Sequence, residues 1–258
     1  MRSRICKIII GVVLGLTIIA ALVITFLYAF KPQLLWRIHG YAMPAMFVDR
    51  LKNVPYSETK YDGIDLSKHN GVIKWKQVAE NKNIKFVYIK ATEGSVIVDP
   101  HYTKNVKDAK AQGLLVGSYH FLTSLTSIRE QFDNFKRTAL KAEQNLIPVI
   151  DVEEAGIKGK WTTEQLQDSV SLFASLVQQH YGKLPVVYTN EDYYKHNLSP
   201  LFDNHYLFIA NYQHSPKLEN AKHNLWQYTE RGHVKGVGEY VDLIMLQNNT
   251  QIEQLKIH

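Results

Sequence analysis

Residues 146–154 read Leu-Ile-Pro-Val-Ile-Asp-Val-Glu-Glu, an apolar run that ends in three carboxylates. A short run rich in Val and Ile is typical of a buried strand in a parallel sheet. Residues i and i+2 of a strand point to the same face, so Asp151 and Glu153 should share one cavity while Glu154 faces away. An isolated D-x-E pattern is more often a polar strand edge than a catalytic pair, because short motifs match by chance. The rest of the chain must therefore decide its meaning.

Similar apolar segments recur along the chain and predict eight strands. Their ranges are 63–66, 86–91, 114–121, 147–152, 185–188, 206–210, 224–228 and 241–246. Helical patterns lie between the earlier segments, at 100–112, 127–144 and 163–181. Strands that alternate with helices predict an α/β fold, here a TIM-like β/α barrel. The connections between the last strands are too short and polar for full helices, so we expect an irregular barrel with fewer helices than strands.

Acidic residues gather at the predicted strand ends that would form the mouth of this barrel. They are Asp65, Glu93, Asp151, Glu153 and Asp242, the last at the beginning of its strand. Converging carboxylates raise each other's pKa, which is unfavourable unless they bind a metal, pair with cations or perform acid–base chemistry. Glycoside hydrolases need one protonated and one ionised carboxyl. We expect Glu153, flanked by apolar groups, to donate the proton and Asp151 to stay charged.

Aromatic residues occupy the same predicted strand ends. They are Tyr119, Tyr188, Tyr212, Trp226 and Tyr228. Any one of them is more often part of a core than a ligand contact. Binding pockets combine such rings with polar groups, and sugars stack their C–H faces on aromatic rings, so the shared location favours a carbohydrate site.

Six motifs resemble the lysozymes of glycoside hydrolase family 25, which are N-acetylmuramidases of bacterial and phage origin. They are Tyr61-Asp-Gly-Ile-Asp65-Leu-Ser67, Lys90-Ala-Thr-Glu93-Gly, Gly117-Ser-Tyr-His120-Phe, Asp151-Val-Glu153, Leu225-Trp226-Gln227-Tyr228 and Val241-Asp242. They follow in order from Tyr61 to about Leu246. The resemblance implies an irregular β/α barrel that hydrolyses the β-1,4 bond between N-acetylmuramic acid and N-acetylglucosamine without a cofactor.

The resemblance also implies roles for individual residues. Glu153 matches the general acid, and Asp151 matches a carboxylate that orients the substrate's N-acetyl group or guides water. Asp65 and Asp242 match further acids of the site. The positions that line the groove correspond to Glu93, Tyr119 and Trp226.

Two departures from the family pattern concern the groove rather than the carboxylates. The chain has Leu243-Ile244-Met245 where the family usually continues Leu-Asn, and Phe208 where a tryptophan is frequent.

Residues 8–30 form an uncharged apolar run, long enough to cross the roughly 30 Å core of a bilayer. A cleaved signal peptide would have a shorter core and a small-x-small cleavage site, so we favour an uncleaved anchor. Arg2, Arg4 and Lys7 predict a cytoplasmic N-terminus at 1–7. Residues 31–60 then form a juxtamembrane spacer, and 61–258 form an extracytoplasmic catalytic domain. The prediction is a single-pass bacterial membrane protein that faces the cell wall.

The 258-residue chain carries a formal net charge of +6. A basic balance favours anionic partners, but no nucleic-acid motif is present, so nucleic acid is not an expected partner. The expected partners are the glycan strands of peptidoglycan and the membrane, and the expected state is a monomer. The single cysteine, Cys6, excludes an intramolecular disulfide.

Two other functions compete with this interpretation. A non-catalytic peptidoglycan-binding module could keep the barrel and groove without turnover, although the presence of Asp65, Asp151, Glu153 and Asp242 argues against it. A metal-dependent amidase would need a ligand cluster, and His69 and His120 are the histidines nearest the predicted site. The chain contains no H-E-x-x-H motif and no compact His/Asp/Cys cluster, so no metal site is predicted.

Overall fold

The computed structural model describes residues 60–157, 159 and 161–257 of the chain. The predicted N-terminus (1–7), membrane anchor (8–30) and nearly all of the spacer (31–60) lie outside the described residues. Among the residues that are described, no helix is both long enough and apolar enough to span a membrane.

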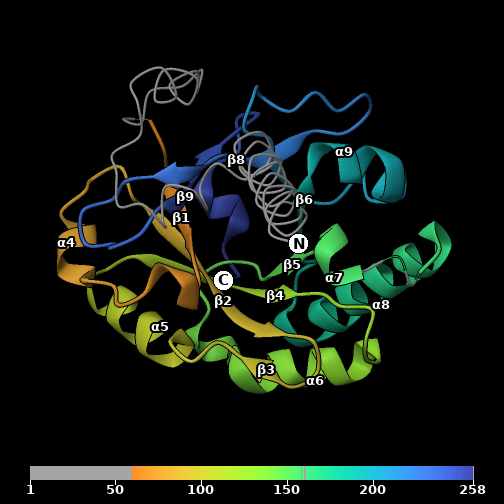
Figure 1. Cartoon of the computed structure of the whole chain (residues 1–258), viewed down its shortest axis with the longest axis horizontal. Helices are drawn as coiled ribbons and strands as arrows, with labels where there is room; N and C mark the ends of the chain where they lie inside the picture. Colours follow the sequence, from red (N-terminus) through yellow and green to blue (C-terminus); the bar gives the residue numbers. More distant parts are fainter. Residues whose placement is uncertain (1–59, 158, 160, 258) are drawn as a thin grey trace, which may run out of the picture. The chain divides into compact units, whose positions relative to one another are not determined.

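Eight strands close into a barrel (Figure 1). They are β1 (Gly63–Leu66), β2 (Phe86–Glu93), β4 (Leu115–Phe121), β5 (Val149–Asp151), β6 (Val186–Asn190), β7 (Leu207–Ala210), β8 (His223–Gly232) and β9 (Val241–Leu246). A short strand, β3 (Ile97–Val98), pairs with the end of β2 as a hairpin. The eight predicted strands are confirmed, although β5 is shorter and β8 longer than predicted.

Strand direction departs from an all-parallel barrel at one place. From β1 to β8, neighbouring barrel strands run parallel, whereas β9 runs antiparallel to both β8 and β1. Only residues 233–240 separate β8 from β9. A parallel crossover needs a dozen or more residues, so this connection permits only a hairpin. The reversal places the beginning of β9 at the end of the barrel where the parallel strands finish.

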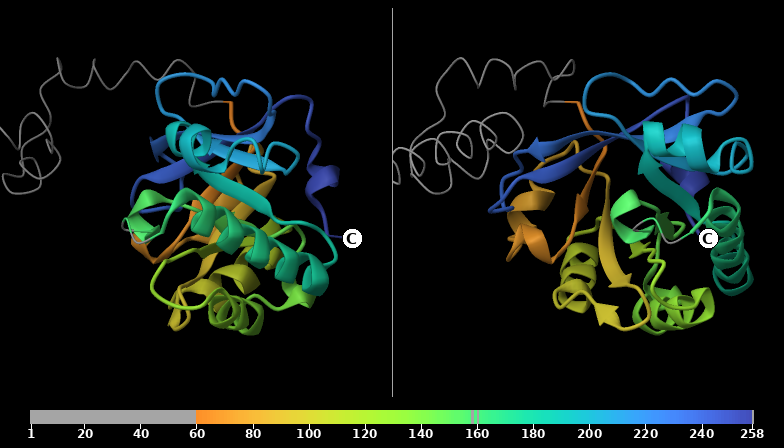
Figure 2. Two further views of the ribbon diagram at one scale, coloured as in Figure 1. Left: turned by 90° about the vertical axis from the view of Figure 1, so that its right-hand side faces the viewer. Right: turned by 45° about the vertical axis from the view of Figure 1, so that its right-hand side comes forward.

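Helices cover only part of the barrel. The longer ones are α5 (Tyr102–Ala111), α6 (Ile128–Thr138) and α8 (Thr163–Tyr181), and the shorter ones are α4 (Trp75–Ala79), α7 (Glu154–Ile157) and α9 (Glu191–Tyr193). Figure 2 shows α5, α6 and α8 along one side, while β8 and β9 lie opposite without a long helix over them. The predicted loss of the late helices is confirmed. A helix is present in each of the three predicted helical regions, although α6 ends at Thr138 rather than at residue 144.

Local sequence explains where these helices begin and end. Ser127 and Glu130 form a capping box at the start of α6. At α8 the capping residues are Thr162 and Gln165, and the helix begins at Thr163 as the pattern predicted. Gly182 ends α8 with φ of 93°, a left-handed conformation that glycine adopts without a Cβ clash.

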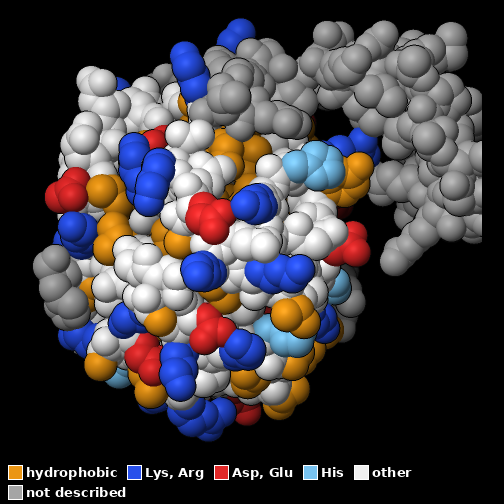
Figure 3. Space-filling model, turned by 90° about the vertical axis from the view of Figure 1, so that its left-hand side faces the viewer, with side chains coloured by type: hydrophobic (Ala, Val, Ile, Leu, Met, Phe, Trp, Pro, Cys, Tyr) orange, Lys and Arg blue, Asp and Glu red, His pale blue; other side chains and the backbone are white. Residues whose placement is uncertain are grey.

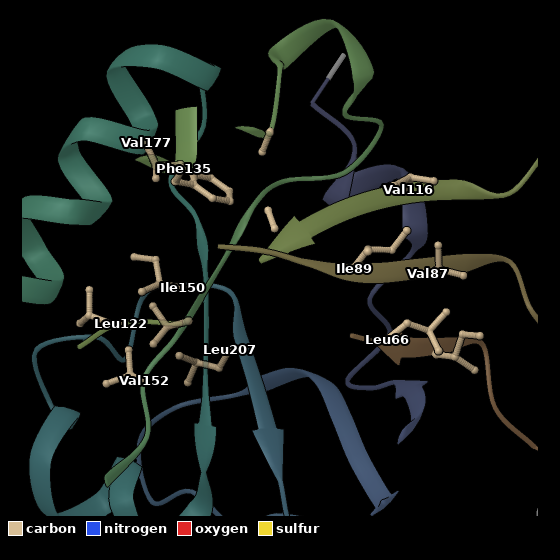
Figure 4. Close-up of a cluster of buried hydrophobic side chains, with 14 of the residues drawn as sticks. Leu66, Val87, Ile89, Val116, Leu122, Phe135, Ile150, Val152, Val177 and Leu207 are labelled. Carbon is tan, nitrogen blue, oxygen red and sulfur yellow. The ribbon is translucent and has the colours of Figure 1, made fainter. Parts of the chain in front are cut away.

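Side chains of the barrel strands alternate between two cores. Inside the barrel, the Tyr88 ring lies 5.9 Å from Phe86 and 6.3 Å from Phe208 between centroids. Outside it, Ile150 and Val152 belong to a second cluster that includes residues of α5, α6 and α8 (Figure 4). Because successive strand residues alternate between faces, this pattern fixes which side chains can reach the barrel mouth.

The net charge of the chain is concentrated outside the described region. Residues 1–59 contain seven Lys or Arg and two Asp or Glu, which accounts for five of the six net positive charges. On the face beside α4 and α5, acidic and basic side chains are interspersed (Figure 3). The barrel domain therefore carries little net charge, and the basic balance of the whole chain says nothing about its ligand.

Gly117 provides a test of packing inside the barrel. A Cβ at this position would lie 2.2 Å from Tyr88 Cε1 and 3.1 Å from Leu146 Cβ. The Tyr88 hydroxyl donates to the Ile147 carbonyl at 3.2 Å, which restrains the ring. We predict that Gly117→Ala lowers the free energy of unfolding by roughly 1–3 kcal/mol, as overpacking does.

Chemical denaturation of the two glycine variants would measure this difference. Gly238→Ala is the control, because a Cβ there meets no atom within 4 Å. Equal stability of the two variants would contradict the packing argument.

Candidate active site

Four of the predicted acids converge at one end of the barrel. Asp65 on β1 lies directly opposite Asp242 on β9 in the antiparallel register. Asp151 is the last residue of β5, and Glu153 follows two residues later, immediately before α7. Each of these carboxylates experiences the charge of at least one of the others. Glu154, by contrast, begins α7 and is exposed, as the strand pattern predicted.

Burial raises the pKa values of all four acids, and the charges of neighbouring acids add to the rise at Asp65, Asp151 and Asp242. Burial raises the pKa of Asp65 well above its ordinary value, and Asp242 adds to the rise. Burial, followed by Glu153 and Asp65, raises the pKa of Asp151 in the same way. The pKa of Asp242 rises to about 7, mainly through burial and the charge of Glu230. Burial also raises the pKa of Glu153. Because the ionisation of one acid affects its neighbours, protons are lost from the group as a whole rather than from each carboxyl independently.

Three of the acids receive a hydrogen bond from a neutral side chain. Tyr119 donates to Asp65, Tyr188 donates to Glu153, and Gln227 donates to Asp242. Each bond lowers the pKa of its carboxyl and so opposes the effect of burial. Tyr119 and Tyr188, which the sequence suggested as ring contacts for a sugar, thus also orient the acids.

Asp151 differs from the other three acids. Its side chain is buried, and its Oδ1 atom has no hydrogen-bond partner among the described residues. A buried acceptor without a partner is unfavourable, by roughly 1–3 kcal/mol for a typical group. A donor on a bound molecule would remove that penalty. Sequence reasoning expected Asp151 to stay charged, whereas burial favours its protonated form in the protein alone.

Lys90 is a cation of the site that the sequence analysis did not single out. Its side chain is 14% exposed and pairs with Glu93 at 2.8 Å, and its ammonium lies 4.7 Å from the centroid of the Phe121 ring. Its positive charge lowers the pKa values of Asp65, Asp151 and Glu153. Strand periodicity indicates that Lys90 points into the barrel, since it follows the inward-facing Tyr88 by two residues on β2. Glu93 therefore acts first as the partner of this lysine.

An open cavity of about 660 Å³ begins at Glu153 and Tyr188. Tyr212, which is 41% exposed, also lines it. Tyr188 rests on Phe208 inside the barrel, with 4.8 Å between ring centroids. Phe208, the residue that departs from the family pattern, therefore supports the wall of the cavity from beneath.

Trp226 and Tyr228 do not reach this cavity. Each is 1% exposed and belongs to the outer core cluster. Alternation along β8 turns Gln227 toward the acids and its two aromatic neighbours outward. Their common position at a strand end did not distinguish these two directions. Trp226 instead donates its indole N–H to the Asn211 carbonyl at 2.8 Å. It thereby fixes the chain just before Tyr212.

His120 also faces the outer core. Its ring lies between Thr92 and Gln131, at 2.7 and 3.2 Å, and stacks on Phe173. Burial lowers the pKa of His120 to about 3, so the ring is neutral near pH 7. No group of three His, Cys, Asp or Glu side chains within the described residues is arranged to hold a metal ion.

Comparison with known proteins identifies the family. The sequence model of glycosyl hydrolases family 25 matches residues 64–237 of the chain. The chain belongs to this family. It is a glycoside hydrolase of the lysozyme type.

Three relatives of the family 25 chain illustrate the match. It is 32% identical to the uncharacterized protein YegX of Escherichia coli over 254 residues, covering 94% of this chain and 90% of YegX. It is 31% identical to the autolytic lysozyme of Clostridium acetobutylicum over 181 residues, which are 70% of this chain and 54% of that lysozyme. The solved family 25 glycosyl hydrolase of Bacillus anthracis superposes with a TM-score of 0.67 at 31% identity, covering 73% of this chain and 90% of the other.

The raised pKa of Asp242 predicts a stability cost in this family 25 domain. The folded-state value of about 7 exceeds the ordinary 3.8, so the folded state binds more protons between these values. Stability is therefore lost as the pH rises through that window. We predict that Asp242→Asn, which cannot ionise, raises the thermal midpoint at pH 8 by a few degrees, because 1 kcal/mol corresponds to about 2–4 °C in a domain of this size.

Thermal unfolding from pH 4 to pH 8 would measure this effect, and the gain should vanish near pH 4. Asp168→Asn is the control, since it removes the same charge from an exposed position on α8. A pH-independent gain, or an equal gain in the control, would contradict the explanation.

Proposed function

We propose that the chain is an N-acetylmuramidase that hydrolyses the β-1,4 bond between N-acetylmuramic acid and N-acetylglucosamine in peptidoglycan. Membership of family 25 and similarity to the autolytic lysozyme support this substrate. The arrangement of the carboxylates supports the reaction type, because glycoside hydrolysis needs a proton donor beside a second carboxylate.

Glu153 is the general acid in this proposal, and its position at the cavity is the observation that carries it. Of the four acids, Glu153 lines the open cavity, while Asp151 lies buried behind it. Burial raises the pKa of Glu153, which favours the protonated carboxyl that a general acid needs. It gives that proton to the departing glycosidic oxygen as the bond from that oxygen to the anomeric carbon breaks.

Asp151 assists by meeting the substrate's N-acetyl group. Its unpartnered Oδ1 is suited to accept a hydrogen bond from the acetamido N–H. That contact favours the ionised carboxylate just as positive charge develops on the sugar, which is when a negative charge is most useful. The burial that raises the pKa of Asp151 in the free protein therefore does not prevent this role.

Asp65 and Asp242 complete the acid cluster on the side of the barrel formed by β1 and β9. Tyr119 and Gln227 orient them, and Lys90 offsets part of the negative charge on the site. In the proposed mechanism they position the substrate and water, and the proton is transferred by Glu153.

Glu153→Gln tests the assignment. The amide keeps the shape of the side chain but cannot donate a proton, so release of fragments from purified cell wall should fall by about 10²- to 10⁴-fold. Glu154→Gln is the matched control, because this neighbouring carboxylate is exposed on α7. Fragments would be separated and identified by mass spectrometry.

The fragments also test the bond. A muramic acid reducing end is the expected product, whereas a glucosamine end or free peptide would refute muramidase cleavage. Unchanged release by Glu153→Gln would refute the catalytic assignment. A wild-type chain that binds the wall and releases nothing would favour a non-catalytic binding module.

The proposed location is the outer side of a bacterial membrane, with residues 8–30 as the anchor. Support comes from the uncharged apolar run and its basic flank at Arg2, Arg4 and Lys7. The similarity to YegX covers 94% of the chain, so it extends from the family region well into the first 59 residues.

N-terminal sequencing of the chain recovered from membranes tests the anchor. The expected result is an intact start that includes residues 8–30, with protease added outside the cell removing the catalytic domain. A mature N-terminus near Lys31 would show that the segment is a cleaved signal instead.

A further inference from the structure

The cavity that Glu153 lines is also lined by charged residues that do not belong to the acid cluster. Its far end is lined by Lys195, His214 and Lys217, which lie on the segments that follow β6 and β7. Asp65, Asp151 and Asp242 do not line it. The cavity therefore has a catalytic end and a second, chemically different end, which we call the distal end.

A buried carboxylate holds the distal end in place. Glu191 begins α9, and its side chain is only 6% exposed. It accepts hydrogen bonds from the Lys195 ammonium, from Asn211 Nδ2 at 2.6 Å and from the Lys217 backbone N–H at 3.2 Å. Burial alone would raise the pKa of Glu191, but the bonds from Lys195 and Asn211 outweigh it and hold the pKa below its ordinary value. Glu191 is thus an ionised structural anchor.

The loop that carries His214 and Lys217 is also held in place by other hydrogen bonds. Asn211 Oδ1 accepts from the backbone N–H groups of Gln213 and His214, at 2.9 and 3.2 Å. The Asn211 carbonyl accepts from Trp226, and the Tyr212 hydroxyl accepts from Gln227 at 3.2 Å. This loop is organised before any ligand arrives, which reduces the entropy lost on binding.

The charged side chains that remain available at the distal end are of both signs, because Lys195 already pairs with Glu191. Lys217 is exposed, and its ammonium has no acidic side chain within ion-pair distance among the described residues. His214 is half exposed, with Nδ1 at 3.9 Å from Glu191. Asp192 adds an acidic side chain to the lining of the same cavity. A wall of mixed sign with a free ammonium suits a ligand that carries carboxylates together with an amine.

Glycan strands alone do not supply such charges. The hydroxyl and acetamido groups of the sugars are neutral, and the lactyl carboxyl of muramic acid is neutral while it forms the amide to the peptide. The attached peptide carries free carboxylates and, in its diamino acid, an amine. A uniform polyanion such as a phosphate polymer would be repelled by Asp192. We propose that the distal end binds the acidic stem peptide of the muramyl residue, with Lys217 contacting a peptide carboxylate.

This inference rests on the proposed muramidase function and adds a source of specificity to it. Contacts to a remote part of a substrate can be used to position the reacting bond, so a peptide-bearing strand should be cleaved more efficiently than a bare one. Lys217 is then a specificity residue, because it touches the substrate away from the reacting atoms.

The test compares two substrates with the full-length chain. One is a purified glycan with its stem peptides, and the other is the same glycan after an amidase has removed them and the lactyl carboxylates thereby freed have been converted to amides, so that no new carboxylate is left on the sugar. Wild type should give the higher kcat/KM on the peptide-bearing glycan. Lys217→Met should reduce the ratio of the two kcat/KM values by about three- to tenfold, as expected for a partly exposed charge-assisted contact. Lys217→Arg should restore most of the ratio at low salt.

Lys222→Met is the matched control, since Lys222 is an exposed lysine on the same connection that does not line the cavity. It should leave both kcat/KM values unchanged. A wild-type enzyme that cleaves both glycans equally, or a Lys217→Met variant that loses activity equally on both, would overturn the inference. A chain that cleaves neither glycan would instead refute the muramidase function, so the two failures are distinguishable.

Discussion

Closure of the barrel through β1 is the constraint on which the site depends. This strand is only four residues long, yet it pairs with β2 on one side and with β9 on the other. Its register brings Asp65 opposite Asp242, and closure brings both onto the same mouth as β5. In an open sheet, the β1–β9 pair would be separated from β5 by several strands. Asp65 and Asp242 would then titrate independently of Asp151. The coupled acid cluster is therefore a consequence of closure.

The acid cluster is unfavourable for folding and useful for chemistry. Burial and like charge push protons onto Asp65, Asp151 and Asp242, and neutral donors and Lys90 offset only part of this effect. Asp151 keeps an acceptor atom without a partner in the described structure. Groups that are poorly satisfied in the free protein can gain more from the transition state than from the resting state, which is what catalysis requires. The two hydrophobic cores supply the stability that tolerates this arrangement.

Several parts of the site could be inferred from the sequence because they depend on local periodicity. The alternation along β5 separated Asp151 and Glu153 from Glu154, and the structure agrees. The same alternation along β8 turns Gln227 inward and Trp226 and Tyr228 outward, which a shared strand end does not reveal. Lys90 could have been found in the same way from Tyr88 on β2. These omissions concern the face of a strand, which two-residue periodicity determines once one inward residue is known.

The sequence by itself determined the eight strands, the positions of the early helices, the family motifs and the set of acids at the strand ends, because each depends on the order of neighbouring residues. It also defined the uncharged run at 8–30 from composition alone. Tertiary structure decided the direction of β9, the pairing of Asp65 with Asp242, the upward shift of the acid pKa values and the distal end of the cavity built on Glu191. These features depend on contacts between residues far apart in the chain and on exclusion of water from their surroundings. Neither the contacts nor the loss of solvent is encoded in any single segment.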